Sequence, residues 1–237
     1  MVNRNTVTWI RKSHRYLGIF LGIQFLFWTS SGLYFSWTNL DEIHGDHFKD
    51  MEYQPKAFKG LMAPSELGIE EGIRSMEVRD INGEPYYWIN NKSLYNARDG
   101  RLKKTINETE ALYIAGLHMK ENLEVAGVTR IESAGKHHEY REKLLPAHVI
   151  SYKGDDNLKA YVSSIDGKFQ TVRHRSWRIF DFLWMTHTRD YEGRDNFNTT
   201  VLRAFSLMGL ITVLSGFILW YISSPTVMKI KKRLKSK

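Results

Sequence analysis

The sequence contains no cysteine among its 237 residues. Disulfide bonds and thiolate metal sites are therefore excluded, and any domain must fold through its own apolar core. Several enzyme motifs are also missing: the G-x-S-x-G nucleophile elbow, the P-loop, the H-E-x-x-H zinc motif and the glycine-rich dinucleotide fingerprint. Hydrolytic chemistry, phosphoryl transfer and a built-in flavin or nicotinamide domain thus have no support.

Charged side chains are missing from two long stretches, residues 16–40 and residues 204–228. Each stretch exceeds the roughly 20 residues that span a hydrocarbon core of about 30 Å. The sequence therefore predicts two membrane-spanning helices, over 16–40 and 204–224. The first apolar run is too long for the h-region of a signal peptide, and Ser36 to Asn39 offer no small-x-small cleavage site. We expect it to remain as an anchor.

Acidic residues are absent from both ends of the chain. Four basic residues precede Tyr16 and six follow Pro225, so the formal net charge of +8 comes from the ends. Only 24 of the 34 basic residues then remain between Asp41 and Arg203, against all 26 acidic ones. A basic excess confined to the flanks of apolar runs follows the positive-inside rule. We expect both termini in the cytoplasm, the middle of the chain outside it, and a lipid bilayer rather than nucleic acid as partner.

The region between the two apolar runs alternates helix and strand signals, which predicts an α+β domain. Ser65 is expected to cap a first helix, and strands over 76–81 and 86–89 flank the hairpin signal Asn82-Gly83. A second helix over 107–120 and strands over 147–152 and 158–165 follow. Because 95–102 and 161–169 end alike, two repeats are expected. The predicted division is a basic tail (1–15), a membrane helix (16–40), the outer α+β region (41–175), an aromatic juxtamembrane helix and loop (176–203), a second membrane helix (204–224) and a basic tail (225–237).

His14 lies at the start of the first apolar run, and Gly18 and Gly22 follow it at i+4 and i+8. On a helix these three residues share one face, where the glycines leave a flat slot beside the imidazole. Such a slot has two interpretations. It fits the edge of a porphyrin with histidine as axial ligand, and it also fits close helix packing below an interfacial histidine.

His187 precedes the second apolar run, at the opposite membrane face. Because the runs are about 30 Å long, His14 and His187 cannot ligate one haem within one subunit. Two haems would each need a second ligand, which a homodimer with a four-helix bundle supplies. Alternatively His44 or His47, three residues apart and expected on one helix face, partners His187. The other five histidines are expected to be solvated residues of the outer region: His118, His137, His138, His148 and His174.

Several stretches resemble PepSY-associated transmembrane proteins. His14-Arg15-Tyr16-Leu17-Gly18, continuing to Ser31-Gly32-Leu33, is similar to the opening of that family. The segments 96–102 and 163–169 resemble the closing strand of PepSY domains, and 182–187 with 215–220 is similar to the last-helix region of the family. The resemblance covers nearly the whole chain.

The resemblance implies an inner-membrane protein of bacteria with a periplasmic domain of two PepSY-like repeats. Some members are haem-containing reductases of ferric iron or ferric siderophores, which implies haem b on His14 and His187, electron transfer to ferric iron or a ferric chelate, and a cytoplasmic donor or quinol. The larger reductases have four membrane helices and this chain has two, so haem binding depends on a homodimer. The alternative is a non-enzymatic membrane-anchored module that binds a partner or regulates a protease.

Overall fold

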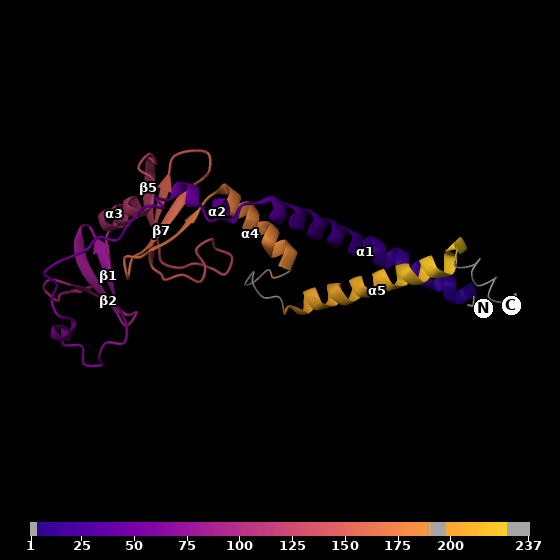
Figure 1. The fold of residues 1–237 in the computed structure, drawn as a ribbon, viewed down its shortest axis with the longest axis horizontal. Helices are drawn as coiled ribbons and strands as arrows, with labels where there is room; N and C mark the ends of the chain where they lie inside the picture. Colours follow the sequence, from indigo (N-terminus) through magenta and orange to yellow (C-terminus); the bar gives the residue numbers. More distant parts are fainter. Residues whose placement is uncertain (1–3, 189, 191–197, 227–237) are drawn as a thin grey trace. The chain divides into compact units, whose positions relative to one another are not determined.

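The computed structural model describes residues 4–188, 190 and 198–226. The chain forms two compact units. We call residues 1–37 with 182–237 the helical unit and residues 38–181 the sheet unit. The division falls within helix α4, Arg175–Thr188 (Figure 1).

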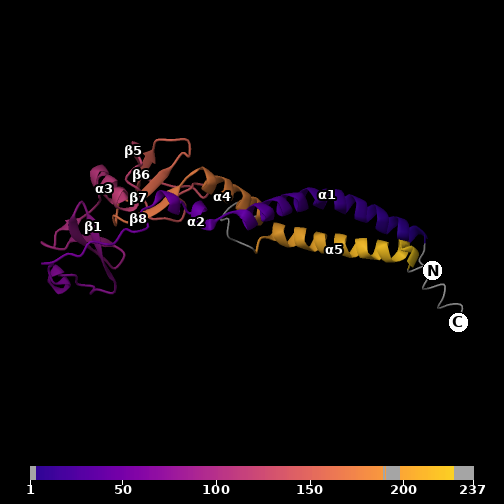
Figure 2. The same cartoon turned by 45° about the horizontal axis from the view of Figure 1, so that its top comes forward.

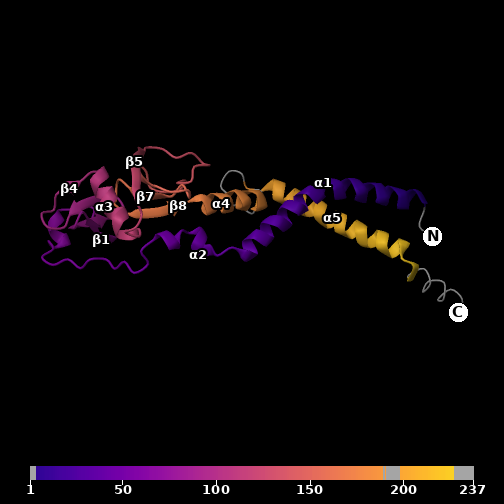
Figure 3. The same cartoon turned by 90° about the horizontal axis from the view of Figure 1, so that it is seen from above.

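The helical unit is built on two long helices, α1 (Arg4–Trp37) and α5 (Thr200–Ser223). They run side by side in opposite directions and cross (Figures 2 and 3). Both are long and apolar enough to cross a membrane. Only 17% of the apolar window of α1 and 11% of that of α5 are buried, which distinguishes them from the core helices of a water-soluble fold. The two apolar segments are thus helical, as predicted, and their large exposed side chains are available for lipid.

The contact between α1 and α5 follows the helical repeat. Leu21, Gln24 and Ser31 are the buried residues of α1, separated by three and seven positions, and Gly209 and Thr212 are the buried residues of α5. Small residues of α5 therefore meet larger residues of α1. The helix also begins earlier than the apolar run, at Arg4 rather than Tyr16, because no glycine or proline interrupts residues 4–15.

The sheet unit contains two four-stranded antiparallel sheets, each with its strands in sequential order. The first sheet consists of β1 (Met76–Ile81), β2 (Glu84–Ile89), β3 (Ser93–Asn96) and β4 (Leu102–Lys103). The second consists of β5 (Val125–Ile131), β6 (Ala147–Tyr152), β7 (Lys159–Ser163) and β8 (Phe169–Arg173). Helix α3 (Glu108–His118) precedes the second sheet and packs on it.

Local sequence signals explain two of these elements. Asn82 and Gly83 have φ of 54° and 81°, the left-handed pair that a two-residue hairpin needs, and β1 and β2 pair across them as predicted. Asn107 and Glu110 form a capping box at the start of α3, each side chain accepting a backbone N–H of the other. The helix predicted over 107–120 is therefore confirmed, with Asn107 as its N-cap.

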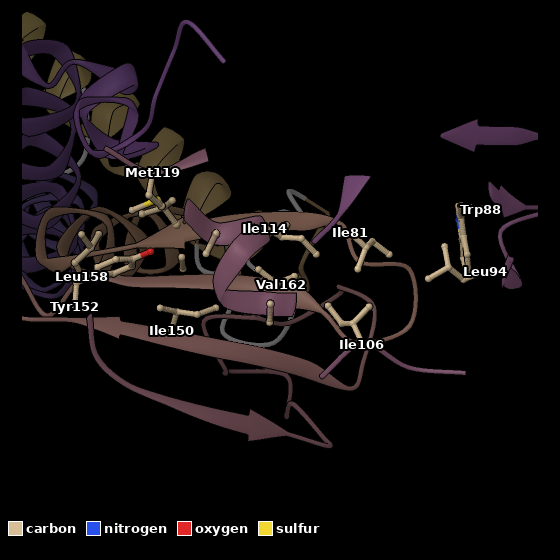
Figure 4. Packing of buried hydrophobic residues seen from close by; sticks show 14 residues of the cluster. Ile81, Trp88, Leu94, Ile106, Ile114, Met119, Ile150, Tyr152, Leu158 and Val162 are labelled. Atoms are coloured by element: carbon tan, nitrogen blue, oxygen red, sulfur yellow. The ribbon is translucent and has the colours of Figure 1, made fainter. Parts of the chain in front are cut away.

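The main core lies between α3 and the second sheet (Figure 4). Ile114 and Met119 face the strands that carry Ile150 and Val162, and Ile81 at the end of β1 extends the same cluster. A Cβ on Gly167 would lie 2.9 Å from the Cδ1 of Ile81, so this contact and a φ of +63° both require glycine there. The first sheet is thereby joined to the second.

Three short helices differ from the sequence prediction. The helix expected with Ser65 as its cap is one 3-10 turn, η2 (Pro64–Leu67), which begins after Ala63 without a side-chain cap. His44 and His47 do not share one helix face. His44 is the C-cap of α2 (Leu40–Ile43), and His47 lies in the separate turn η1 (Asp46–Phe48), because Gly45 takes a left-handed φ of 76° between them.

Candidate functional site

His14 faces α5 inside the helical unit. Its Nδ1 lies 2.8 Å from the Oγ of Ser215 and 3.2 Å from the carbonyl oxygen of Thr212. The Ser215 hydroxyl donates to that same carbonyl at 2.7 Å. Since the one proton of the hydroxyl is used on the carbonyl, both neighbours of Nδ1 act as acceptors. We therefore assign the proton to Nδ1 of His14.

His187 has the same kind of partner at the other end of α1. Its Nδ1 lies 2.7 Å from the Oγ of Ser31, and the Ser31 hydroxyl donates to the carbonyl of Phe27 at 2.7 Å. The indole of Trp28 donates to the His187 carbonyl at 2.9 Å. The ring of Phe35 meets the imidazole edge on, with centroids 5.5 Å apart. The last turn of α4 is thus held against α1 with its imidazole in a defined orientation.

The two histidines therefore carry the same relay, in which imidazole Nδ1–H donates to a serine hydroxyl that donates to a helix carbonyl. In the neutral imidazole this leaves the lone pair on Nε2. Within the described ranges no hydrogen-bond partner meets Nε2 of His14 or His187. A histidine that ligates a metal through one nitrogen typically donates the other N–H in this way.

The relays are far apart along α1. His14 and Ser31 are 17 positions apart in one helix, which places the relays about 25 Å apart at 1.5 Å per residue. The two imidazoles cannot ligate one metal ion. The expectation that they do not share a haem within one subunit agrees with this spacing.

The predicted slot at Gly18 and Gly22 is not where α5 packs. A Cβ on either glycine would meet no described atom within 4 Å. The close approaches involve glycines of α5 instead. A Cβ on Gly216 would lie 3.2 Å from the Cε1 of His14, and one on Gly209 would lie 3.2 Å from the Cζ of Phe25. The face of α1 that carries Gly18 and Gly22 is thus open in the described chain.

A groove of about 430 Å³ lies on the helical unit between the two relays. This volume is within the range of roughly 300–1,000 Å³ that small-molecule sites occupy. Its lining is apolar and mostly aromatic except for the buried side chain of Gln24 and the hydroxyl of Thr186, which donates to the Phe182 carbonyl. The remaining lining residues are Phe20, Ile23, Phe27, Phe182 and Phe205.

The other histidines have structural surroundings in the sheet unit. His47 is exposed and packs against Phe48 and His174, with ring centroids 3.9 and 5.3 Å away. His174 is bonded through Nε2 to the carbonyl of Ile43, and burial lowers its pKa. His44 is exposed. Among the residues that the structure describes, no three His, Asp or Glu side chains are grouped to hold a metal ion.

The residues that sequence reasoning missed are the partners of the histidines. Ser215 and Gly216 are small residues of an apolar helix, and Ser31 lies in a Ser-Ser-Gly segment. Their residue type was visible in the sequence, but which of them face a histidine depends on how α1 packs against α4 and α5. The resulting donor, a neutral imidazole Nε2 backed by an Nδ1–H bond, is one that suits a haem iron.

Comparison with known proteins identifies one family. The family described as PepSY-associated TM region matches residues 2–222, which include both long helices and the sheets between them. No curated protein and no solved structure matches the chain. The match covers far more than half of the sequence. The chain therefore belongs to the PepSY-associated transmembrane family, as its resemblance predicted.

Proposed function

We propose that this protein is a b-type cytochrome that moves electrons across the membrane to ferric iron or a ferric chelate. The observation that supports the proposal is the relay at His14 and His187. Each relay gives an imidazole a fixed orientation and leaves its Nε2 without a hydrogen-bond partner among the described residues, at two depths of one helical unit.

Each residue of the relay has a separate role. His14 and His187 would hold the haem through Nε2, and a bound haem would supply reversible one-electron chemistry. Ser215 and Ser31 hold the ring orientation and the tautomer by accepting from Nδ1.

A second copy of the chain would supply the second histidine at each haem. A homodimer joins two pairs of long helices into a four-helix bundle, the number that the larger reductases carry in one chain. The face of α1 with Gly18 and Gly22 is open for this contact, and glycines permit a close approach of helices or of a porphyrin. His44 and His47 remain the alternative partners of His187.

The charge distribution supports an orientation. Both termini lie in the cytoplasm of a bacterium, both long helices span the inner membrane, and the sheet unit lies in the periplasm. The two four-stranded sheets are two PepSY-like repeats, the first with the turn η2 where the second has α3. Electrons come from a cytoplasmic donor or from quinol.

The test is the absorption spectrum of the full chain, purified in detergent from cells supplied with haem. We expect a Soret band, and an α-band that sharpens on reduction. His14→Ala and His187→Ala should each lose about half of the haem, as measured by pyridine haemochrome against protein. The matched control is His137→Ala, an exposed histidine of the sheet unit, which should keep the full content.

Substitution of the two relay serines tests the proposal through a second measurement, the haem affinity. Ser215→Ala and Ser31→Ala should lower haem affinity by about 10- to 100-fold, the usual effect of losing the hydrogen bond behind a ligand. A full-length folded protein without a Soret band would overturn the proposal, and the anchored module that binds a partner would take its place.

A further inference from the structure

A second cavity lies within the sheet unit, away from every residue of the relays. Its volume is about 260 Å³. Its walls come from residues 53–58 ahead of the first sheet, from β1, from the end of α3 and from the turn between β7 and β8. Four segments distant in the sequence thus surround one small space.

The charges at this cavity are mostly positive. Lys56, Arg79 and Lys168 line it, and Asp80 is its single carboxylate. Both oxygens of Asp80 already accept hydrogen bonds from the protein. Its Oδ1 accepts the Gly83 N–H at 2.8 Å, and its Oδ2 accepts the Tyr113 hydroxyl at 3.4 Å. Counting Glu77, which pairs with Arg79, the three cations exceed the two carboxylates by one, so the cavity favours an anion.

Two side chains at this cavity, Arg79 and His118, have ring or guanidinium nitrogens without a hydrogen-bond partner among the described residues. The Nε of Arg79 is buried and has no hydrogen-bond partner among the described residues, although the Nη1 of the same guanidinium pairs with Glu77. The ring nitrogens of His118 likewise meet no hydrogen-bond partner in the described part of the chain. A buried N–H without an acceptor costs free energy, which an anionic ligand would recover.

The walls of the same cavity also carry aromatic side chains. His118 stacks on Phe169 with ring centroids 4.7 Å apart, and Tyr53 meets it edge on at 4.5 Å. Burial lowers the pKa of His118, so its ring is neutral at pH 7 and extends the aromatic surface. Flat rings of this kind favour the face of an aromatic ligand. Inorganic anions alone would leave this surface without a contact.

We infer that this cavity binds a small aromatic carboxylate, with the acid on Arg79 and the ring beside Phe169 and His118. The volume lies below the usual range of roughly 300–1,000 Å³, which limits the ligand to a single ring with a short acid group. The same chemistry occurs in a free aromatic acid and at the C-terminal phenylalanine of a peptide. The inference is independent of haem binding.

The experiment is calorimetric titration of the full chain in detergent with phenylacetate, and separately with the peptide Ala-Ala-Phe. We expect saturable binding of phenylacetate, and at least tenfold weaker binding of its uncharged amide and of acetate, which lacks the ring. Tighter binding of Ala-Ala-Phe than of phenylacetate assigns the site to peptide termini, and the reverse order assigns it to free acids. Both orders support the proposed chemistry.

Substitutions test whether phenylacetate binds in this cavity. Arg79→Met should weaken phenylacetate binding at least tenfold, whereas Arg101→Met, at a side chain that is 86% exposed and outside the cavity, should not change it. Val78→Trp keeps every charge and fills the space from the edge strand β1, so it should also abolish binding. Near-ultraviolet circular dichroism establishes that each variant is folded. Equal affinity for phenylacetate and its amide, or unchanged affinity in folded Arg79→Met and Val78→Trp, would refute the assignment.

Discussion

Glu139 is the centre of an ion-pair network in the sheet unit, and the effect of its substitution on the free energy of unfolding can be predicted. Its carboxylate accepts two hydrogen bonds from Arg178, at 2.7 and 3.2 Å, and one from the Tyr161 hydroxyl. The ammonium group of Lys159 lies 3.6 Å away. Since Arg178 belongs to α4, the network fastens the start of this helix to the second sheet. We consider the substitution Glu139→Gln, which keeps the shape and removes the charge.

The magnitude follows from the burial of these partners. Removing one member of a fully buried ion pair costs about 3–5 kcal/mol because the other charge is left uncompensated. The side chain of Glu139 is 15% exposed, but that of Arg178 is 28% exposed, so water screens part of the interaction. We expect Glu139→Gln to lower the free energy of unfolding by about 2–3 kcal/mol at pH 7. For a unit of roughly 140 residues this lowers the melting temperature by about 6–12 °C.

The effect depends on pH with a definite sign. Burial raises the pKa of Glu139, but the hydrogen bonds of Arg178 and Tyr161 and the charges of Arg178 and Lys159 outweigh it, so the pKa is lower than its ordinary value of 4.5. A carboxyl group whose pKa falls on folding stabilises the protein above the unfolded-state pKa. This contribution is lost as the pH falls through the lower pKa of the folded state. The difference between wild type and Glu139→Gln should therefore be full at pH 7 and shrink below about pH 4.5.

The assay is thermal unfolding in detergent, followed by the near-ultraviolet circular dichroism of the tyrosines. Tyr140 and Tyr161 stack beside the network, 4.8 Å apart, and report its loss. The control is Glu71→Gln, because Glu71 pairs with Lys92 at the surface and is 50% exposed, so its loss should cost less than about 1 kcal/mol. Equal melting temperatures for the two variants at pH 7 would show that the network does not stabilise the unit.

Two further predictions concern a helix contact and a helix cap. If His14 holds the proposed haem, Gly216→Leu should displace its imidazole from Ser215 and lower the haem content by about half. Pyridine haemochrome measures this, and full haem in Gly216→Leu would contradict the reasoning. Asn107→Ala removes the capping box of α3 and should cost about 1–2 kcal/mol in thermal unfolding, and a change below about 0.3 kcal/mol would mean that the box adds nothing.

Much of the fold could be predicted where a local signal determines the conformation. Strand β6 has the predicted bounds, Ala147–Tyr152, because it is buried and rich in β-branched residues between turn signals. Strand β5 was missed because Val125–Ile131 is mostly exposed and contains Gly127, so no alternation marks it. The basic residues before Tyr16 were assigned to a tail from their charge alone. They are helical because helix propagation depends on the absence of breakers rather than on hydropathy.

The residues of the candidate site were also only partly predictable from the sequence. His14 and His187 stood out from their positions at the ends of apolar runs, which is a property of the sequence. Ser31, Ser215 and Gly216 could not be chosen from the other small residues of the helices. Which hydroxyl faces an imidazole depends on how α1 packs against α4 and α5, and the paired residues lie 156 and 201 positions apart in the sequence.

The continuity of α1 has a consequence for the depth of the site in a membrane. A helix of 34 residues is about 51 Å long, some 20 Å more than a hydrocarbon core. Arg11 and Arg15 are exposed and one turn apart, on the same rigid rod that carries His14. Guanidinium groups settle at the layer of lipid phosphates. The two arginines therefore fix the depth of α1 in the bilayer, and with it the axial distance of the His14 imidazole from the lipid phosphates.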